Sequence, residues 1–515
     1  MKFVMSGFFI LCLLVVGCNG VPKTYIAPKT FAIKDTSDTV LAKMLNPAIQ
    51  SHNGNSGFVP LEAGTDAYKA RVVSIQMAQK TLDLQYYLWA DDRIGKAMGH
   101  EVIQAADRGV RVRLLLDDLN LGPYEDALLA LDRHPQIEVR MFNPFSFRKI
   151  RLFEIIRFHQ AHRRMHGKLM IADNQLAITG GRNIGEQYFT AHGEENFGDY
   201  DVWAFGPIVG QCSNAFDEYW NSGFSVPISV LNHREITDED YKNLRDSFAS
   251  ASKDLQKSSY AKQLATSTLD TDFRVGKVKT YWGKAQIYYD SPEKIDQENQ
   301  DTYDGKNLKK YMESMPISPP TKELFIVSPY FIPGAKGVEY FKNKEAKGVQ
   351  VSVFTNSLGS NDVPLTFAGY KKYRKQLIKA GVDLYELKPR VTPKVRKFRL
   401  VGSSGARLGL HGKVFIFDRR AMFVGSLNLD PRSIELNTEF GVLFESPELA
   451  DQFLNNALRF LPELSYRVRL NDKNEIQWNT VEGGKNVVLS EEPDARWWQS
   501  FQSEFLSLLV PETML

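Results

Sequence analysis

Hydrophobic and polar residues follow two alternating patterns along the first half of the chain. A helical spacing of apolar residues begins at Ala67 and leads into an apolar strand over 82–89. A second helical stretch over 96–108 ends at Gly109 and is followed by a strand over 110–116 with a buried pattern. Strands that alternate with helices predict an α/β fold around a largely parallel sheet.

The same order of elements returns in the second half. A strand over 324–330 precedes a helix over 335–347, a glycine at 348 and another strand over 349–355. Two generic α/β units without kinship would explain this much. Polar stretches rich in turn-forming or charged residues divide the chain. We therefore expect a signal segment at 1–17, a tether at 18–56, a first domain at 57–233, a connecting segment with some helix at 234–312 and a second domain at 313–515.

The composition excludes several classes of protein. The 515 residues include 64 Lys and Arg against 61 Asp and Glu, and 43% are hydrophobic. These values exclude a disordered chain, a collagen-like fibre and a polytopic membrane protein. The formal charge of +3 gives no global attraction to nucleic acid. Three cysteines exclude a disulfide scaffold and a cysteine-built zinc site. Cys212, in an apolar stretch, is expected to be a buried free thiol.

The N-terminus has the pattern of an export signal. Lys2 precedes an apolar run over 3–16 that is too short to span a bilayer comfortably. The run ends in Leu-Val-Val-Gly-Cys18, which resembles the lipobox of bacterial lipoproteins. That resemblance implies cleavage before Cys18 and attachment of several acyl chains, which anchor a protein stably where one is marginal. Asn19 implies the outer rather than the inner membrane. An uncleaved signal anchor with an incidental Cys18 is the alternative.

A motif of chemically active residues occurs twice. Each copy contains a histidine, a lysine, an aspartate, a glycine pair or Gly-Ser, and an asparagine. The interval from His166 to His411 is 245 residues, and the same interval separates the other equivalent positions. Such a repeat at domain scale indicates two related halves. The residues are His166, Lys168, Asp173, Gly180, Gly181 and Asn183 in the first copy, and His411, Lys413, Asp418, Gly425, Ser426 and Asn428 in the second.

These residue types suit chemistry at phosphorus. His and Lys two positions apart on a strand project from the same face, so two facing copies bring both pairs to one point. The lysines would neutralise phosphate oxygens, and Asn183, Asn428 and Ser426 would help to bind them. One imidazole can attack phosphorus while the other protonates the leaving group and then activates the acceptor. Because lysines and amides supply the positive potential, we expect no metal and no other cofactor.

This arrangement resembles the phospholipase D superfamily, whose signature is HxKxxxxD followed by GGxN or GSxN. The second motif continues through Asp430 and Arg432 to Glu439, close to the family pattern GSxNxDxRSxxxNxE. The first continues to Asp199-Tyr-Asp201. The resemblance implies two tandem α/β/α sandwich domains that are related by a pseudo-two-fold axis and share one active site. Because each half supplies half of the site, a monomer should suffice.

The resemblance also implies a role for each site residue. In the family, an acidic residue after each motif hydrogen-bonds to the histidine of the opposite half. Glu439 would then orient His166, and Asp201 would orient His411, with Asp199 as the alternative to Asp201. His166 is the preferred nucleophile. Asp173 and Asp418 would tie the local backbone and lysine together. The catalytic set is His166, Lys168, Asp173, His411, Lys413 and Asp418.

Other segments resemble bacterial cardiolipin synthases of the C type. They are Ser328–Pro333 (SPYFIP), 285–292 (AQIYYDSP) and the ending that contains Trp497-Trp498. The A type carries N-terminal membrane spans where this chain has a lipobox. The resemblance implies a transferase that passes a phosphatidyl group through a phosphohistidine to a lipid hydroxyl. Its substrates would be phosphatidylglycerol and also phosphatidylethanolamine.

Basic segments with apolar side chains precede both motifs, at 145–164 and 387–399. Such segments suit anionic lipid headgroups, although solvated surfaces or a nucleic-acid backbone would also explain them. We expect a lipid-anchored enzyme of the bacterial envelope that faces the periplasm and does not act on nucleic acid. A hydrolytic phospholipase D that releases phosphatidic acid is the first alternative. A metal-independent nuclease is less favoured, because those nucleases are short single-motif dimers, and so is a non-catalytic lipoprotein, because both motifs are intact.

Overall fold

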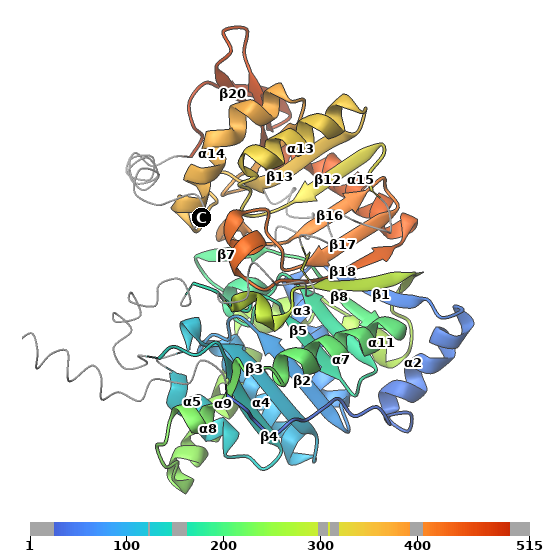
Figure 1. Ribbon diagram of the computed structural model, residues 1–515, viewed down its shortest axis with the longest axis vertical. Coiled ribbons are helices and arrows are strands. Elements are labelled where there is room, and N and C mark those ends of the chain that lie inside the picture. Colours follow the sequence, from blue (N-terminus) through green and yellow to red (C-terminus); the bar gives the residue numbers. More distant parts are fainter. Residues whose placement is uncertain are drawn as a thin grey trace, which may run out of the picture.

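Two large β-sheets, one from each half of the chain, form the centre of the computed structural model (Figure 1). The structure describes residues 25–121, 124–146, 162–296, 307–308, 319–391 and 405–494. The signal segment, Cys18, most of the two basic segments and Trp497-Trp498 lie outside these residues. In Figure 1 the first half, blue to green, is below and the second half, yellow to red, is above.

The first sheet has nine strands. In order across the sheet they are β10 (Tyr281–Gly283), β1 (Ser56–Leu61), β8 (Asp201–Phe205), β6 (Leu176–Gly180), β5 (Leu169–Ala172), β2 (Thr81–Tyr86), β3 (Arg111–Asp117), β4 (Ile137–Phe142) and β9 (Ser225–Pro227). Only the neighbours β2–β3 and β3–β4 are parallel. The prediction of a largely parallel sheet is therefore wrong, because the motif strands β5 and β6 form an antiparallel hairpin beside the three parallel strands.

The second sheet repeats this arrangement. Its ten strands, in order, are β11 (Ala285–Tyr289), β18 (Phe440–Glu445), β17 (Ala421–Gly425), β16 (Val414–Phe417), β12 (Glu323–Val327), β13 (Gln350–Asn356), β14 (Asp383–Leu387), β19 (Ser465–Leu470), β20 (Ile476–Glu482) and β21 (Lys485–Leu489). The eight strands from β11 to β19 match those from β1 to β9 of the first sheet in order and in the direction of every pairing. The predicted α/β fold with two related halves is confirmed.

Helices cover the outer faces of both sheets and lie between them. α3 (Gly64–Met77), α4 (Arg93–Asp107) and α5 (Glu125–Asp132) pack on the outer face of the first sheet, and α13 (Gly334–Ala346) and α14 (Pro364–Lys379) on that of the second. α7 (Pro207–Trp220) and α15 (Pro447–Leu464) contribute to a core that joins the inner faces of both sheets. The remaining helices described are α2 (Val40–Ser51), α8 (Ile228–Leu231), α9 (Asp238–Lys257), α10 (Ser259–Leu264) and α11 (Leu269–Arg274).

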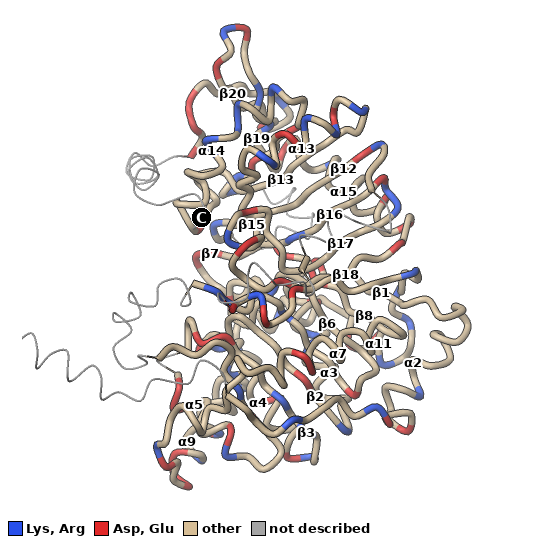
Figure 2. The backbone as a smooth tube through the Cα atoms, in the orientation of Figure 1, with Lys and Arg blue, Asp and Glu red and all other residues tan. Residues whose placement is uncertain are grey.

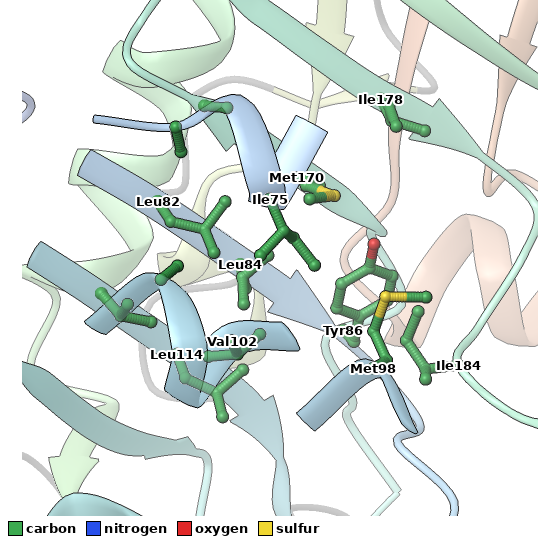
Figure 3. Packing of buried hydrophobic residues seen from close by; sticks show 14 of the residues in the cluster. Ile75, Leu82, Leu84, Tyr86, Met98, Val102, Leu114, Met170, Ile178 and Ile184 are labelled. Carbon is green, nitrogen blue, oxygen red and sulfur yellow. The ribbon is translucent and has the colours of Figure 1, made fainter. Parts of the chain in front are cut away.

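Alternation along the strands divides the core into layers. In β2 the apolar residues Leu82, Leu84 and Tyr86 point to the outer face, where they meet Ile75 of α3 and Met98 of α4 (Figure 3). The intervening residues of β2 face the inner core and include Asp83, which pairs with buried Arg113 of β3 (Nε to Oδ1, 2.7 Å). The free thiol of Cys212 is buried between the sheets, as expected.

The described part of the predicted tether belongs to the first domain. We call residues 25–35 the N-terminal strap. The Tyr25 amide donates to the Gly223 carbonyl (2.7 Å), and buried Arg140 and Arg113 donate to the carbonyls of Pro28 and Thr30 (both 2.9 Å). Helix α2 and strand β1 follow the strap. The tether prediction is therefore wrong for residues 25–56, because the backbone of the strap bonds to buried side chains and α2 buries Leu41, Ala42 and Leu45.

The predicted connecting segment is also part of both domains. Helix α9 packs along α4, whereas β10 joins the edge of the first sheet and β11 joins the edge of the second. The chain thus crosses between the sheets at Lys284 and supplies an edge strand to each.

Lys and Arg residues are interspersed with Asp and Glu over both halves (Figure 2). Among the described helices, none combines the length and the apolar character needed to cross a bilayer.

Candidate active site

Each motif histidine is held by the backbone of the opposite half. The His166 amide donates to the carbonyl of Thr438 (2.8 Å), and the His411 amide donates to the carbonyl of Gly198 (2.7 Å). The second contact extends a short parallel ladder between β7 (Glu195–Gly198) and β15 (Arg407–Leu410). The two contacts are equivalent under exchange of the halves, as a pseudo-two-fold relation requires.

The residue after each backbone acceptor is a buried carboxylate that contacts the histidine. Nδ1 of His166 lies 2.9 Å from Oε2 of Glu439, and Nδ1 of His411 lies 2.6 Å from Oδ2 of Asp199. The expected contact of Glu439 with His166 is present. Because Nδ1 is occupied in both rings, Nε2 is the nitrogen through which either histidine can act on a substrate.

The structure corrects the acidic partner of His411 from Asp201 to Asp199. Strand pairing aligns Asp201 with Gly180 in the first half and Gly441 with Gly425 in the second, so Asp201 corresponds to Gly441 and Asp199 to Glu439. Asp201 instead accepts a hydrogen bond from buried Arg71 (2.9 Å). The repeat interval of 245 residues does not extend to the acidic residues, because the first half carries a longer connection before β8.

The difference between Gly-Gly and Gly-Ser follows from the two carboxylates. A Cβ atom at Gly181 would lie 2.0 Å from Oδ1 of Asp199, so this position admits no side chain while Asp199 contacts His411. At the equivalent position, the Ser426 hydroxyl donates to Oε2 of Glu439 (2.5 Å) and accepts from the Phe440 amide (3.0 Å). The Ser426 hydroxyl was expected to bind phosphate. Its contacts show instead that it holds Glu439.

Two buried lysines bring positive charge to the histidines. Nζ of Lys168 donates to the carbonyl of His166, and Nζ of Lys413 donates to that of His411, both at 2.5 Å. Burial lowers the pKa of both lysines. After burial and the lysine of its own motif, the charge of the lysine in the opposite motif also lowers the pKa of each histidine. Together with the contacts of each histidine to the opposite half, this charge coupling is consistent with one site built from both motifs.

The two histidine–carboxylate pairs differ in their electrostatics. Burial and the Lys413 charge lower the pKa of His411 to about 4. Burial opposes ionisation of Asp199, but contact with His411 outweighs it and lowers the pKa of Asp199 to about 2. Burial raises the pKa of Glu439 to about 7. At neutral pH Asp199 is thus a full anion, whereas Glu439 titrates.

Asp173 and Asp418 lie away from the histidines. Asp173 accepts from the backbone amides of Gln79, Lys80 and Thr81, at the opposite end of β5 from His166. Asp418 accepts from the amides of residues 321–323 in the same way. The predicted tie to the local backbone is present, but the tie to the lysines is absent, since each lysine bonds to its histidine carbonyl. Neither aspartate is placed to contact a substrate, which corrects their inclusion among the catalytic residues.

The two motif asparagines have different surroundings. Asn183 accepts from the Leu88 amide (3.2 Å) and donates to the Tyr188 hydroxyl (3.2 Å). Asn428 is buried, and its Oδ1 has no hydrogen-bond partner among the described residues. Asn428 is therefore the motif asparagine whose side chain is available to a substrate.

Sequence reasoning missed a matched pair of supports for the histidines. Oδ2 of Asp117 accepts from the amide of Met165 (2.9 Å), and Oδ1 of Asn356 accepts from the amide of Leu410 (2.8 Å). Each thus fixes the residue that precedes a motif histidine. Asp117 and Asn356 end the equivalent strands β3 and β13, so a polar residue after a buried parallel strand was the available signal.

Aromatic rings complete the walls of the site. The ring of Tyr87 meets His166 edge-on with centroids 5.2 Å apart, and Tyr188 meets His411 in the same way at 5.1 Å. No cluster of three or more His, Cys, Asp or Glu side chains that could hold a metal ion occurs in the part of the chain that the structure describes.

Comparison with known proteins shows one family over both halves. The family model described as "Cardiolipin synthase, PLD-like domain" matches residues 72–220 and 316–460, which is more than half of the chain. Cardiolipin synthase C of Escherichia coli (strain K12) is 36% identical over 484 residues, covering 92% of this chain and 99% of that protein. An uncharacterized protein of Helicobacter pylori (strain ATCC 700392 / 26695) is 32% identical over 506 residues, or 97% of each chain.

A solved structure shares the fold. The crystal structure of phosphatidylserine synthase from Haemophilus influenzae superposes with a TM-score of 0.53 at 14% identity, covering 91% of this chain and 99% of that one. At this level of identity the likeness concerns the arrangement of the two sheets.

Proposed function

Because the chain belongs to the cardiolipin synthase family of phospholipase D-like proteins and is a phospholipid phosphatidyltransferase, we propose that it is a cardiolipin synthase. It would transfer a phosphatidyl group from one glycerophospholipid to the hydroxyl of phosphatidylglycerol. Phosphatidylglycerol or phosphatidylethanolamine would be the donor. The observation that carries this proposal is the convergence of two histidine–carboxylate pairs and two buried lysines from opposite halves.

In the first step, Nε2 of His166 attacks the phosphorus of the donor lipid. The bond from phosphorus to the headgroup oxygen breaks, and His411 gives its proton to that oxygen. Lys168 and Lys413 stabilise the charge on the phosphate oxygens, since each has further N–H groups beyond the one that binds its histidine carbonyl. The contact of Asp199 with Nδ1 of His411 (2.6 Å) supports this assignment. Against the lowering by burial, the charge and hydrogen bond of Asp199 raise the pKa of His411, and so favour the cationic form that an acid requires.

In the second step, neutral His411 accepts the proton of the acceptor hydroxyl. The acceptor oxygen attacks phosphorus, the phosphorus–nitrogen bond to His166 breaks, and the phosphatidyl group passes to the acceptor. Water in place of a lipid hydroxyl would give phosphatidic acid by the same route, which is the hydrolytic alternative.

Lipid analysis of cells that lack cardiolipin synthases tests the proposal. Expression of the full chain is expected to produce cardiolipin, and expression of His166→Ala or His411→Ala at equal protein level is expected to produce none. New phosphatidic acid without cardiolipin would show that the protein is a hydrolase and would reject the synthase proposal. Near-normal turnover in either variant would overturn the two-histidine mechanism, and trapping of the phosphoenzyme in one of them identifies the nucleophile.

We further propose that the protein is a monomeric envelope lipoprotein that is anchored through Cys18, faces the periplasm at the outer membrane and does not act on nucleic acid. The N-terminal strap supports the anchor. Tyr25 bonds to Gly223, which neighbours the carboxyl end of β4, on the side where the chain enters the first motif. Cys18 and Tyr25 are seven positions apart in the sequence, and a chain of that length spans at most about 25 Å. An anchor there would hold the active-site edge close to the membrane.

Incorporation of labelled palmitate into the wild-type chain tests the anchor. Label and membrane fractionation are both expected to be lost in Cys18→Ala. Wild-type protein that takes up no label but still fractionates with membranes would point to an uncleaved signal anchor.

A further inference from the structure

The segment that crosses between the sheets lies directly behind the carboxylate of one catalytic pair. It comprises β11, Asp290, Ser291 and the short helix Pro292–Ile295, and it contains the AQIYYDSP sequence that no part of the mechanism has used so far. Asp290 is fully buried, and Lys294 is 5% exposed. Their side chains form an ion pair, with Nζ of Lys294 2.9 Å from Oδ2 of Asp290.

Asp290 binds the backbone of Glu439 on both sides. Its Oδ2 accepts from the Glu439 amide (2.9 Å), and its own amide donates to the Glu439 carbonyl (3.0 Å). Oδ1 accepts from the Leu308 amide (2.8 Å), so both carboxylate oxygens are used. Lys294 also reaches the carbonyl of Ser433 (3.4 Å). The backbone from which the Glu439 side chain extends to His166 is therefore fixed by this pair.

The first half supports its carboxylate with a different group. Strand pairing aligns β1 with β11 and places Ala63 where the second half has Asp290. In the first half, Arg182 supports the backbone of the carboxylate instead: its guanidinium donates to the carbonyls of Asp199 and Leu61 (both 2.7 Å). A single cation thus supports the backbone of Asp199, whereas the ion pair of Asp290 with Lys294 supports that of Glu439.

We propose that Asp290 and Lys294 are positioning residues that hold Glu439 against His166 and thereby make the two histidine pairs unequal. The inference rests on the proposed use of both histidines in transfer. Asp290 touches neither substrate nor histidine and acts through Glu439. The crossing segment, which the sequence presented as part of a connection, is in this view a component of the first histidine's environment.

Histidine-selective 15N NMR of the full chain tests this proposal, with signals assigned from His166→Ala and His411→Ala. Asp290→Asn is expected to shift the His166 signals and to leave those of His411 in place. Turnover is expected to fall about 10–100-fold with little change in KM, by analogy with the loss when a hydrogen-bonding partner that orients a metal-ligating side chain is removed. Glu386→Gln is the matched control, because it removes another buried carboxylate, paired with Arg374. It should leave the His166 and His411 signals and kcat unchanged.

A double variant separates positioning from folding. Asp290→Asn leaves Lys294 buried without its anion, so Asp290→Asn with Lys294→Met is expected to regain stability but not turnover. Recovery of kcat in the double variant, unchanged His166 signals in Asp290→Asn, or equal shifts of both histidines would overturn the proposal. A selective His166 shift in a chain that makes no cardiolipin would instead reject the proposed function and keep the positioning role.

Discussion

Replacing Asp199 and Asp201 separately by asparagine distinguishes catalysis from stability at two neighbouring carboxylates. Asp199 lies 2.6 Å from Nδ1 of His411, and Asp201 lies 2.9 Å from Nη2 of Arg71. All four side chains are buried. We expect Asp199→Asn to lose turnover and remain folded, and Asp201→Asn to lose stability and keep a kcat within about tenfold of the wild type.

The magnitudes follow from what each carboxylate contacts. Asparagine at 199 cannot stabilise a cationic His411 and favours the wrong tautomer, which costs about 10⁴-fold in kcat when the aspartate of a catalytic triad is changed in this way. That loss corresponds to about 5.5 kcal/mol of transition-state stabilisation. Asparagine at 201 leaves Arg71 buried without its anion, and breaking a buried ion pair from one side costs about 3–5 kcal/mol.

The assay pairs lipid turnover with urea denaturation on the same preparations. Turnover is counted per folded molecule, so that loss of folded Asp201→Asn protein is not mistaken for loss of catalysis. Asp201 contacts Arg182, and Arg182 binds the Asp199 carbonyl. We therefore expect Asp201→Asn to lose some kcat through this indirect contact, but no more than about tenfold. The reasoning is refuted if Asp199→Asn retains kcat within about tenfold while a normally stable Asp201→Asn is inactive.

Three further changes test the site and its frame. Gly181→Ser is expected to lower kcat about 100-fold, because a Cβ there displaces Asp199 from His411; wild-type kinetics would contradict the geometry. Asp173→Ala is expected to cost about 3–5 kcal/mol in urea denaturation, because three backbone amides lose their acceptor and alanine must take a positive φ, while kcat per folded molecule stays within a few-fold. Burial raises the pKa of Glu439 to about 7. The contribution of its protonated form to the free energy of unfolding is therefore fully present below pH 4.5 and is lost as pH rises through 7. The free energy of unfolding of Glu439→Gln should therefore rise by up to about 3 kcal/mol relative to that of the wild type between pH 4 and pH 8. A difference in unfolding free energy that does not change with pH would show that Glu439 ionises normally.

Much of the fold and site was predictable from local sequence. The strands predicted over 110–116 and 349–355 became β3 (Arg111–Asp117) and β13 (Gln350–Asn356), because closely spaced valine, leucine and phenylalanine residues suit a strand in the interior of a sheet. The repeated motif likewise predicted one site from two halves, because identical residue types at identical spacing fold into equivalent hairpins. The histidines and lysines were found in this way.

The sequence alone determined which residue types the site contains and that two halves supply them. Only the tertiary structure decided which carboxylate meets His411, since 212 positions separate Asp199 from it and the connections before the two carboxylates differ in length. The same holds for Asp290, which reaches Glu439 from 149 positions away through the edge strand β11. Local periodicity carries no information about partners so distant in the chain, because strand register and the crossing between sheets set those distances.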